Sequence, residues 1–352
     1  MAHSIAILSV MPRLSYHLRL KLPNLRIIDV LPDKSDTLAK LRSAEIVVTD
    51  CDLFLPYRDK LPSLIWVQTT WAGVEALASN IRDKKINYTI TRFSDKVFGT
   101  AMSEYVVAHI FNFERDQRNQ YRNQMNNQWI KDGKISDHRF ISDLSVGILG
   151  LGNIGKSIAQ KLKIFGATVW GITRTSLKEN LDYLDEHRTI EHLPEMLSHC
   201  DYIVNVLPST PNTLGLLNGN ILKNCQKHGS VFINIGRGSI IKEADLLNAL
   251  QQQWISGAIL DVFEDEPLSA KSELWTLPQV ILRYTSRLLT RIFRSNPISK
   301  LLIKYIISQV TISPHIAGVT RAQDVANFFA RNYQRFIKNE ELLNVVNLKD
   351  GY

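Results

Sequence analysis

Residues 146–174 read VGILGLGNIGKSIAQKLKIFGATVWGITR, and this stretch decides the fold. A strand-like apolar run ends at Leu149, and three glycines then open a helical pattern that closes near Gly166. These glycines are Gly150, Gly152 and Gly155. In a βαβ unit the first allows a tight turn, the second lets a pyrophosphate approach, and the third lets helix and strand pack closely. A glycine-rich turn without a ligand is a common alternative. The order of strand, turn, helix and strand favours a dinucleotide site, with the helix amides from about Asn153 facing the phosphates.

The residues after the second strand of this unit bear on the choice of cofactor. An NAD site places Asp or Glu about 20 residues after the glycines, where it binds the ribose 2′-hydroxyl. This chain has Thr173, Arg174, Thr175 and Ser176 there, with Lys178 just beyond. An arginine and hydroxyls suit a 2′-phosphate, which an acid would repel. We therefore predict NADPH/NADP as the preferred cofactor and NADH/NAD as the alternative, against the plainer interpretation of a solvated basic loop.

Outward from this unit, short β-branched runs alternate with helical patterns, which is typical of parallel α/β structure in a chain long enough for two domains. The strands expected in a first unit are IAILSV, LRIIDV, EIVVTD, LIWVQT and INYTIT. The strands expected in a second unit are SVGILG, ATVWGIT, YIVNVLP, SVFINIG, GAILDVF and VTISP. One amphipathic helix is predicted from about Thr100 to Gln124, and the polar segment 117–128 is expected to mark a boundary.

Three polar residues after strands suit the reduction of a 2-oxo acid. Arg237 can bind a carboxylate beside a ketone, and its flanking glycines are interpreted as room for the ligand. His315, as an imidazolium, can give the ketone oxygen a proton, and Glu266 can stabilise that imidazolium before the transfer. Each residue alone has a plainer interpretation as a surface ion pair, a loop residue or a structural hydrogen bond. Their shared place at carboxyl ends of strands, where open α/β sheets bind ligands, favours a catalytic group.

Together these segments resemble the D-isomer-specific 2-hydroxyacid dehydrogenase family, and most of all its glyoxylate/hydroxypyruvate reductase A branch. The segments that carry the resemblance are GILGLGNIG, NVLPSTPNT, INIGRGSIIKEADL, GAILDVFEDEPL and SPHIAG, with the GY ending. The resemblance implies two Rossmann-like domains with parallel sheets, the cofactor domain being inserted into a discontinuous substrate domain. It places the substrate domain at 1–111 and 319–352 and the NAD(P)-binding domain at 112–318. It also implies a homodimer.

The resemblance further implies site residues. Arg237 would bind the substrate, His315 would donate the proton and Glu266 would be its partner. The segment TTWAGVEAL matches the family's substrate loop, which comprises Trp71, Ala72, Gly73 and Val74. There the Gly73 and Val74 amides would bind the carboxylate, and the bulk of Trp71 implies a small substrate. The cofactor-binding residues implied are Gly150, Gly152, Asn153, Ile154, Gly155, Arg174, Thr175, Ser176, Leu207, Pro208, Thr213, Ile235, Asp261 and Gly318.

The chain departs from the family pattern at residues 281–310, which separate LWTLPQV from TISPHIAG. This basic insert contains six Lys or Arg residues and no acid, so it carries most of the net charge of +8. Such a local charge argues against a nucleic-acid partner. Because a Gln-Val pair stands at both junctions, we hypothesise a retained intron or an alternative splice form, which a genomic sequence without intron boundaries there would contradict. The alternatives are a basic amphipathic helix with Arg283, Arg287, Arg291 and Arg294 on one face, able to bind an anionic membrane, or a loosely packed loop.

The remaining features exclude several classes. Cys51, Cys200 and Cys225 are too few and too dispersed for a disulfide framework or a metal site, and they suit a reducing, cytoplasmic compartment. The first residues read as a strand rather than a signal peptide, and no apolar run is long enough to span a membrane. The predicted function is NADPH-dependent reduction of glyoxylate or hydroxypyruvate. One alternative is the same enzyme class acting on phosphoglycerate, lactate or a bulkier oxo acid. The other is a catalytically silent NAD(P)-binding isoform or interaction module.

Overall fold

A computed structural model describes residues 3–81, 85–280, 306–308 and 310–348, and the chain divides into two compact units. The first unit comprises Met1–Ala101, Pro208–Leu214 and Gly318–Tyr352, and the second comprises Met102–Leu207 and Gly215–Ala317. The first unit is thus discontinuous in sequence. The boundary between the units lies at residue 101, inside helix α5 (Lys96–Glu114), whereas the family resemblance implies a boundary at residue 111.

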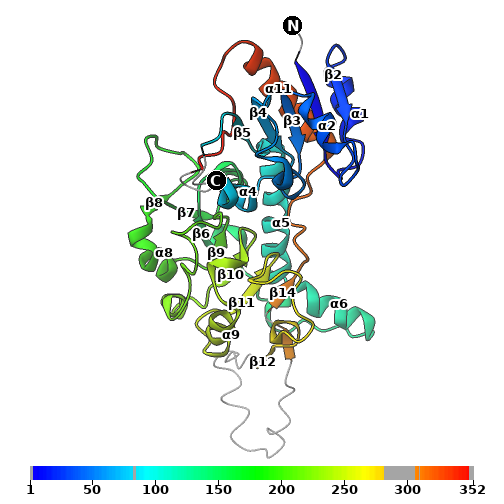
Figure 1. The fold of residues 1–352 in the computed structure, drawn as a ribbon. Helices are drawn as coiled ribbons and strands as arrows, with labels where there is room; N and C mark the ends of the chain where they lie inside the picture. The colour runs from blue at the N-terminus through cyan, green and yellow to red at the C-terminus, as the bar shows by residue number, and fades with distance from the viewer. Residues whose placement is uncertain (1–2, 82–84, 281–305, 309, 349–352) are drawn as a thin grey trace, which may run out of the picture. The chain divides into compact units, whose positions relative to one another are not determined.

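The first unit contains a five-stranded parallel sheet in the order β2-β1-β3-β4-β5 (Figure 1). Its strands are β1 (Ser4–Leu8), β2 (Arg26–Asp29), β3 (Ile46–Thr49), β4 (Trp66–Thr69) and β5 (Thr89–Thr91). Its helices are α1 (Leu14–Lys21), α2 (Thr37–Arg42), α3 (Cys51–Phe54), α4 (Glu75–Ile81) and α11 (Ala322–Ile337). The five strands expected from the apolar runs are all present.

Two cores cover the faces of this sheet, because successive side chains of a strand point to opposite sides. Ile5 and Ile7 of β1 pack with α1 and α11, whereas Ala6 and Leu8 pack with α2, α3 and α4. The C-terminal helix α11 therefore belongs to the same core as the first strand.

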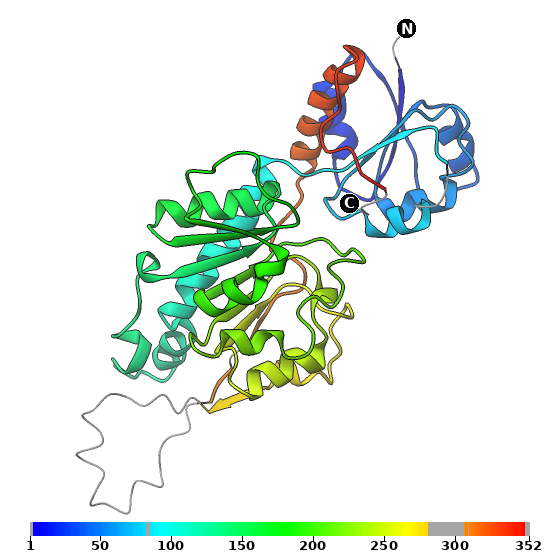
Figure 2. The ribbon, with the colours of Figure 1, turned by 90° about the vertical axis from the view of Figure 1, so that its left-hand side faces the viewer.

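The second unit contains a seven-stranded parallel sheet in the order β14-β11-β10-β9-β6-β7-β8, with helices on both faces (Figure 2). Its strands are β6 (Ser145–Leu149), β7 (Thr168–Thr173), β8 (Glu186–Thr189), β9 (Tyr202–Asn205), β10 (Val231–Asn234), β11 (Gly257–Leu260) and β14 (Val310–Ile312). Its helices include α6 (Gln117–Met125), α7 (Asn153–Ile164), α8 (Leu193–His199) and α9 (Glu243–Gln251). The chain leaves β6 toward β7 on one side and returns to β9 on the other, which is the doubly wound order of a Rossmann fold. Its topological switch point lies at β6, the usual place for a ligand.

Two sequence expectations about this unit were wrong. The strand β8 was missed because its sequence EHRT has no apolar run, and all four residues are only half-buried at the sheet edge. The single helix expected over 100–124 is instead the pair α5 and α6, which is broken where Asp116 takes a left-handed φ of 49°.

One short strand precedes the insert and another lies near its end, and the two form a separate sheet. Strand β12 (Pro278–Val280) pairs antiparallel with β13 (Ile306–Ser308), and Val310 then starts β14, which is in register with β11. The predicted basic amphipathic helix with Arg283, Arg287, Arg291 and Arg294 lies outside the described residues. Among the helices that the structure describes, none is long and apolar enough to cross a membrane.

Candidate active site

The glycine-rich turn between β6 and α7 has the shape that a pyrophosphate requires. Gly150 has a φ of 101°, which a residue with a side chain rarely adopts. A Cβ atom on Gly155 would lie 1.9 Å from the Gly150 carbonyl oxygen, so only glycine lets α7 pack this closely. Gly152 has no atom within 4 Å of where its Cβ would stand, and it caps α7. The turn therefore presents helix amides beside open space and fits a dinucleotide phosphate.

The residues expected to read the 2′-phosphate follow β7, the neighbour of β6. Arg174, Thr175 and Ser176 are exposed directly after the strand. Thr173 Oγ1 donates to the Thr175 carbonyl oxygen at 2.6 Å and lies 2.7 Å from His187 Nε2 of β8. The missed strand β8 thus supports the start of this loop.

His315 and Glu266 form a direct pair in the second unit. His315 Nδ1 lies 2.8 Å from Glu266 Oε2, and Glu266 Oε1 accepts a hydrogen bond from the Phe263 amide at 3.0 Å. With Nδ1 held by the carboxylate, Nε2 is the ring nitrogen that can exchange a proton with a substrate. The His315 side chain is 55% exposed, so a ligand can reach it.

Arg237 directly precedes the 3₁₀ turn Gly238–Ile240 that follows β10, and its Nη1 donates to the Gly236 carbonyl oxygen at 2.6 Å. The interpretation of its flanking glycines as room for a ligand was wrong. A Cβ on Gly236 would lie 2.7 Å from Asn205 Nδ2, and one on Gly238 would lie 1.8 Å from Phe263 backbone atoms. These glycines are needed because the turn packs directly on neighbouring backbone.

Arg237, Glu266 and His315 follow β10, β11 and β14, which are three adjacent strands of one sheet. All three therefore lie along the carboxyl edge of the second unit's sheet. The arrangement combines a cation, a proton donor and a carboxylate that supports the donor.

Asp261 has a structural role that the sequence did not indicate. It is buried directly after β11, and its Oδ1 accepts hydrogen bonds from Ser313 Oγ at 2.6 Å and from the Ile316 amide at 2.8 Å. Its Oδ2 accepts from the Ala317 amide at 2.8 Å. Asp261 thus binds the segment on both sides of His315. No local pattern in the sequence could indicate it, because the partners are more than fifty residues away.

The other predicted residues are distributed over both units. Leu207 follows β9 and Ile235 follows β10 in the second unit, whereas Pro208, Thr213 and Gly318 are counted with the first. Thr213 Oγ1 donates to the Pro208 carbonyl oxygen at 2.6 Å. Residues 71–74, here called the carboxylate loop, follow β4 in the first unit, with the side chain of Trp71 exposed.

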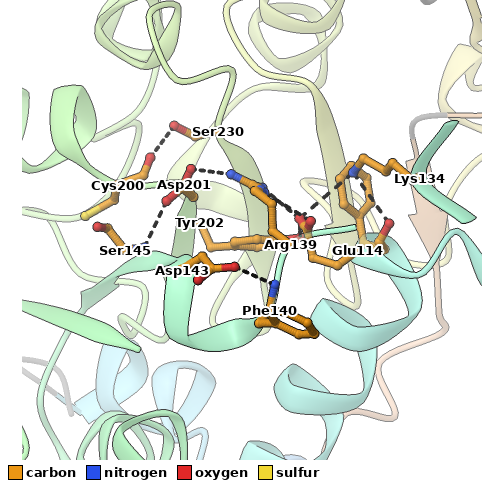
Figure 3. Close-up of polar contacts among 11 residues, drawn as sticks. Glu114, Lys134, Arg139, Phe140, Asp143, Ser145, Cys200, Asp201, Tyr202 and Ser230 are labelled. Atoms are coloured by element: carbon orange, nitrogen blue, oxygen red, sulfur yellow. Dashed lines mark hydrogen bonds and ion pairs between the residues drawn. The ribbon is translucent and has the colours of Figure 1, made fainter. Parts of the chain in front are cut away.

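A second polar cluster lies away from these residues, at the amino ends of β6 and β9 (Figure 3). Arg139 donates to Glu114 at 2.7 Å and to Asp201 at 2.5 Å, and the Tyr202 hydroxyl donates to Glu114 at 2.7 Å. Burial alone would raise the pKa of Glu114. The hydrogen bonds from Arg139 and Tyr202 and the charge of Lys134 outweigh it, so the pKa of Glu114 lies below its ordinary value. The cluster ties α5 to the sheet at the edge opposite the candidate site and has a structural role.

Comparisons with known proteins identify the family of this chain. The family model of the D-isomer specific 2-hydroxyacid dehydrogenase NAD binding domain matches residues 107–283. A family member from Aeromonas salmonicida is 29% identical, with a TM-score of 0.78 over 99% of this chain and 100% of that one. A Xanthobacter autotrophicus member in complex with NADPH and MES is 26% identical, with a TM-score of 0.79 over all of both chains.

An NADPH-dependent glyoxylate/hydroxypyruvate reductase from Sinorhizobium meliloti, in complex with NADP and sulfate, is also similar. It is 26% identical, with a TM-score of 0.78 over 99% of this chain and 100% of that one. The chain therefore belongs to the D-isomer specific 2-hydroxyacid dehydrogenase family and is an NAD(P)-dependent oxidoreductase.

Proposed function

We propose that this enzyme reduces a small 2-oxo acid, glyoxylate or hydroxypyruvate, to the 2-hydroxy acid and prefers NADPH. The observation that carries the proposal is the 2.8 Å pair of His315 and Glu266, at the same sheet edge as Arg237. A proton donor and a cation at one edge match what a 2-oxo acid needs on reduction. The similar Sinorhizobium meliloti reductase gives further support.

The roles of the residues follow from their chemistry. Arg237 binds the carboxylate and ketone oxygens of the substrate through its fork of N–H donors. The nicotinamide cofactor supplies the hydride. His315 gives its Nε2 proton to the ketone oxygen, and Glu266 stabilises the imidazolium before that transfer. In the first unit, the amides of Gly73 and Val74 bind the substrate carboxylate and Trp71 limits its size.

The cofactor preference rests on the loop after β7. No acidic residue follows that strand directly, and the exposed Arg174, Thr175 and Ser176 offer a cation and two hydroxyls to a 2′-phosphate. The glycine-rich turn supports binding of the pyrophosphate. The Asp261 carboxylate accepts three hydrogen bonds and can accept a further one. We propose that this further acceptor site binds the nicotinamide carboxamide.

We further propose a cytoplasmic homodimer. The three cysteines are buried and free, which suits a reducing compartment. Large apolar side chains are exposed in the second unit at Tyr121, Met125 and Trp129, and such a group of side chains suits contact with a second copy.

The alternative function is a catalytically silent NAD(P)-binding isoform, because the insert directly precedes the strand that leads to His315. The register of β14 with β11 supports the enzyme instead, since this strand keeps its place in the sheet.

The test is the rate of NADPH oxidation by the full chain with glyoxylate and with hydroxypyruvate. We expect turnover of at least one acid, and a fall of roughly 10²–10⁴-fold in kcat for His315→Ala with NADPH binding retained. Quenching of NADPH fluorescence without turnover by a folded protein would contradict the proposal and favour the silent isoform.

A further inference from the structure

Three successive carbonyl oxygens of the carboxylate loop each accept a hydrogen bond from a side chain of the first unit. Thr69 Oγ1 donates to the Trp71 oxygen at 2.9 Å, and Arg92 Nη1 donates to the Ala72 oxygen at 3.0 Å. Cys51 Sγ lies 3.6 Å from the Gly73 oxygen, within the range of a thiol donor. Each peptide of this short loop is thus held from outside the loop.

The three donors come from three neighbouring parts of one sheet. Thr69 ends β4, Arg92 follows β5, and Cys51 starts α3 two residues after the end of β3, so all three donors lie along the carboxyl edge of β3-β4-β5. The Arg92 backbone amide is itself bound to the Asn344 carbonyl oxygen at 3.1 Å. The backbone that carries the Arg92 donor is therefore itself anchored.

Holding a carbonyl oxygen also sets the direction of the next amide, because the C=O and N–H of one planar trans peptide point in opposite directions. The bond from Arg92 to the Ala72 oxygen directs the Gly73 amide away from Arg92. The bond from Cys51 to the Gly73 oxygen likewise directs the Val74 amide away from Cys51. Neither amide donates a hydrogen bond to another residue within the part of the chain that the structure describes.

The chemical state of both donors suits this task. Burial raises the pKa of the Cys51 thiol to about 12, so the sulfur keeps its proton and remains a donor at neutral pH. The guanidinium of Arg92 places a positive charge beside the Ala72 carbonyl oxygen. Because hydrogen bonds in series polarise one another, this contact strengthens the Gly73 amide, which belongs to the same peptide, as a donor to an anion.

We propose that Arg92 and Cys51 are positioning residues that aim the Gly73 and Val74 amides at the carboxylate of the 2-oxo acid. This inference rests on the proposed function of those two amides. The two residues do not touch the substrate; they act through the peptides that they hold.

The test compares the variants Arg92→Met and Cys51→Ala with the wild-type enzyme. The KM for glyoxylate and the Kd of oxamate, a carboxylate-bearing substrate analogue, are measured on the NADPH-loaded full chain. We expect KM and Kd to rise together, roughly tenfold for Arg92→Met and about threefold for Cys51→Ala, with kcat nearly unchanged. This split follows because the carboxylate is held equally in the ground state and the transition state.

Conservative variants and a matched control separate positioning from general damage. Cys51→Ser keeps an O–H donor and is expected to restore KM and Kd, and Arg92→Lys is expected to restore them in part. Cys200→Ala removes a thiol that is equally buried but lies in the second unit, and it should leave both constants at wild-type values.

Wild-type KM and Kd in folded Arg92→Met and Cys51→Ala would overturn the inference while the proposed function stands. A wild-type enzyme that reduces no 2-oxo acid would overturn the proposed function. Oxamate binding then still decides the inference, which fails if oxamate does not bind or if its Kd is the same in all variants.

Discussion

The backbone amide of His315 donates to the Asp261 carbonyl oxygen at 2.8 Å, at a point where His315 has a left-handed φ of 55°. A residue with a side chain pays roughly 1–2 kcal/mol for that conformation. The Asp261 carboxylate offsets this cost, since it accepts the amides of Ile316 and Ala317 and the hydroxyl of Ser313. Asp261 thus holds the imidazole in the place where Glu266 meets it.

We expect Asp261→Asn to misplace His315 while leaving the protein folded. The asparagine NH₂ group would take the place of one carboxylate oxygen, so a donor would face a backbone N–H of Ile316 or Ala317. A small misplacement of a catalytic group lowers kcat by roughly 10²-fold. Steady-state kinetics and the melting temperature measure the two effects. A variant with wild-type kcat would show that the His315 conformation does not depend on this carboxylate.

Glu266→Gln is expected to lower kcat by roughly 10²-fold or more, because a neutral amide holds the imidazolium less well than a carboxylate. The matched control is Glu264→Gln. Glu264 is exposed in the same loop and accepts the Glu243 amide at 3.1 Å, and its loss should change kcat by no more than about twofold. Equal kinetics of the two variants would contradict the assignment of Glu266.

The cofactor preference can be tested at Arg174. We expect Arg174→Ala to raise the KM for NADPH roughly tenfold and to leave the KM for NADH unchanged, since only NADPH has the 2′-phosphate. Lys178→Ala, which removes another exposed cation of the same loop, is the control and should change neither constant appreciably. Parallel changes for both cofactors in Arg174→Ala would point to a general effect on the loop.

Arg139 is predicted to stabilise the second unit at neutral pH. Arg139→Met removes the guanidinium from buried Glu114, which keeps the Tyr202 hydroxyl and the charge of Lys134, and should lower the free energy of unfolding by roughly 1.5–3 kcal/mol. The pKa of Glu114 is lower in the folded state than in the unfolded chain. The stabilisation by ionised Glu114 is therefore fully present when the pH is above the unfolded-state pKa, and it is lost as the pH falls through the folded-state pKa. The difference between wild type and variant should therefore shrink in acid.

Denaturant unfolding at neutral and acidic pH measures this difference. The control is Arg188→Met, because Arg188 also binds two carboxylates, Glu186 and Glu195, but all three side chains are partly exposed. That variant should cost no more than about 1 kcal/mol. Equal losses for the two arginines would mean that burial of Glu114 does not decide the effect.

The parts of this molecule that the sequence predicted are those written in local patterns. Apolar runs marked the strands that are buried on both faces, and the spacing of Gly150, Gly152 and Gly155 marked the cofactor turn. Strand β8 was not predicted, because a strand at the edge of a sheet can form without an apolar run in its sequence. The roles of Asp261, Arg92 and Cys51 could not be predicted from the sequence for another reason. Each depends on hydrogen bonds between residues that are distant in sequence, and no spacing rule covers such bonds.

The insert provides the last prediction. Deleting residues 281–310 joins Val280 to Thr311, so Val280 takes the place of Val310 and the register of β14 with β11 can be kept. Strands β12 and β13, which stand on either side of residues 281–305, are already paired, and the entropy of closing a chain segment grows only slowly with its length. We therefore expect the shortened and full chains to reduce glyoxylate with kcat values within about twofold of each other. Turnover by the shortened chain alone would show that the insert displaces the strand that leads to His315, and the full chain would then be the silent isoform.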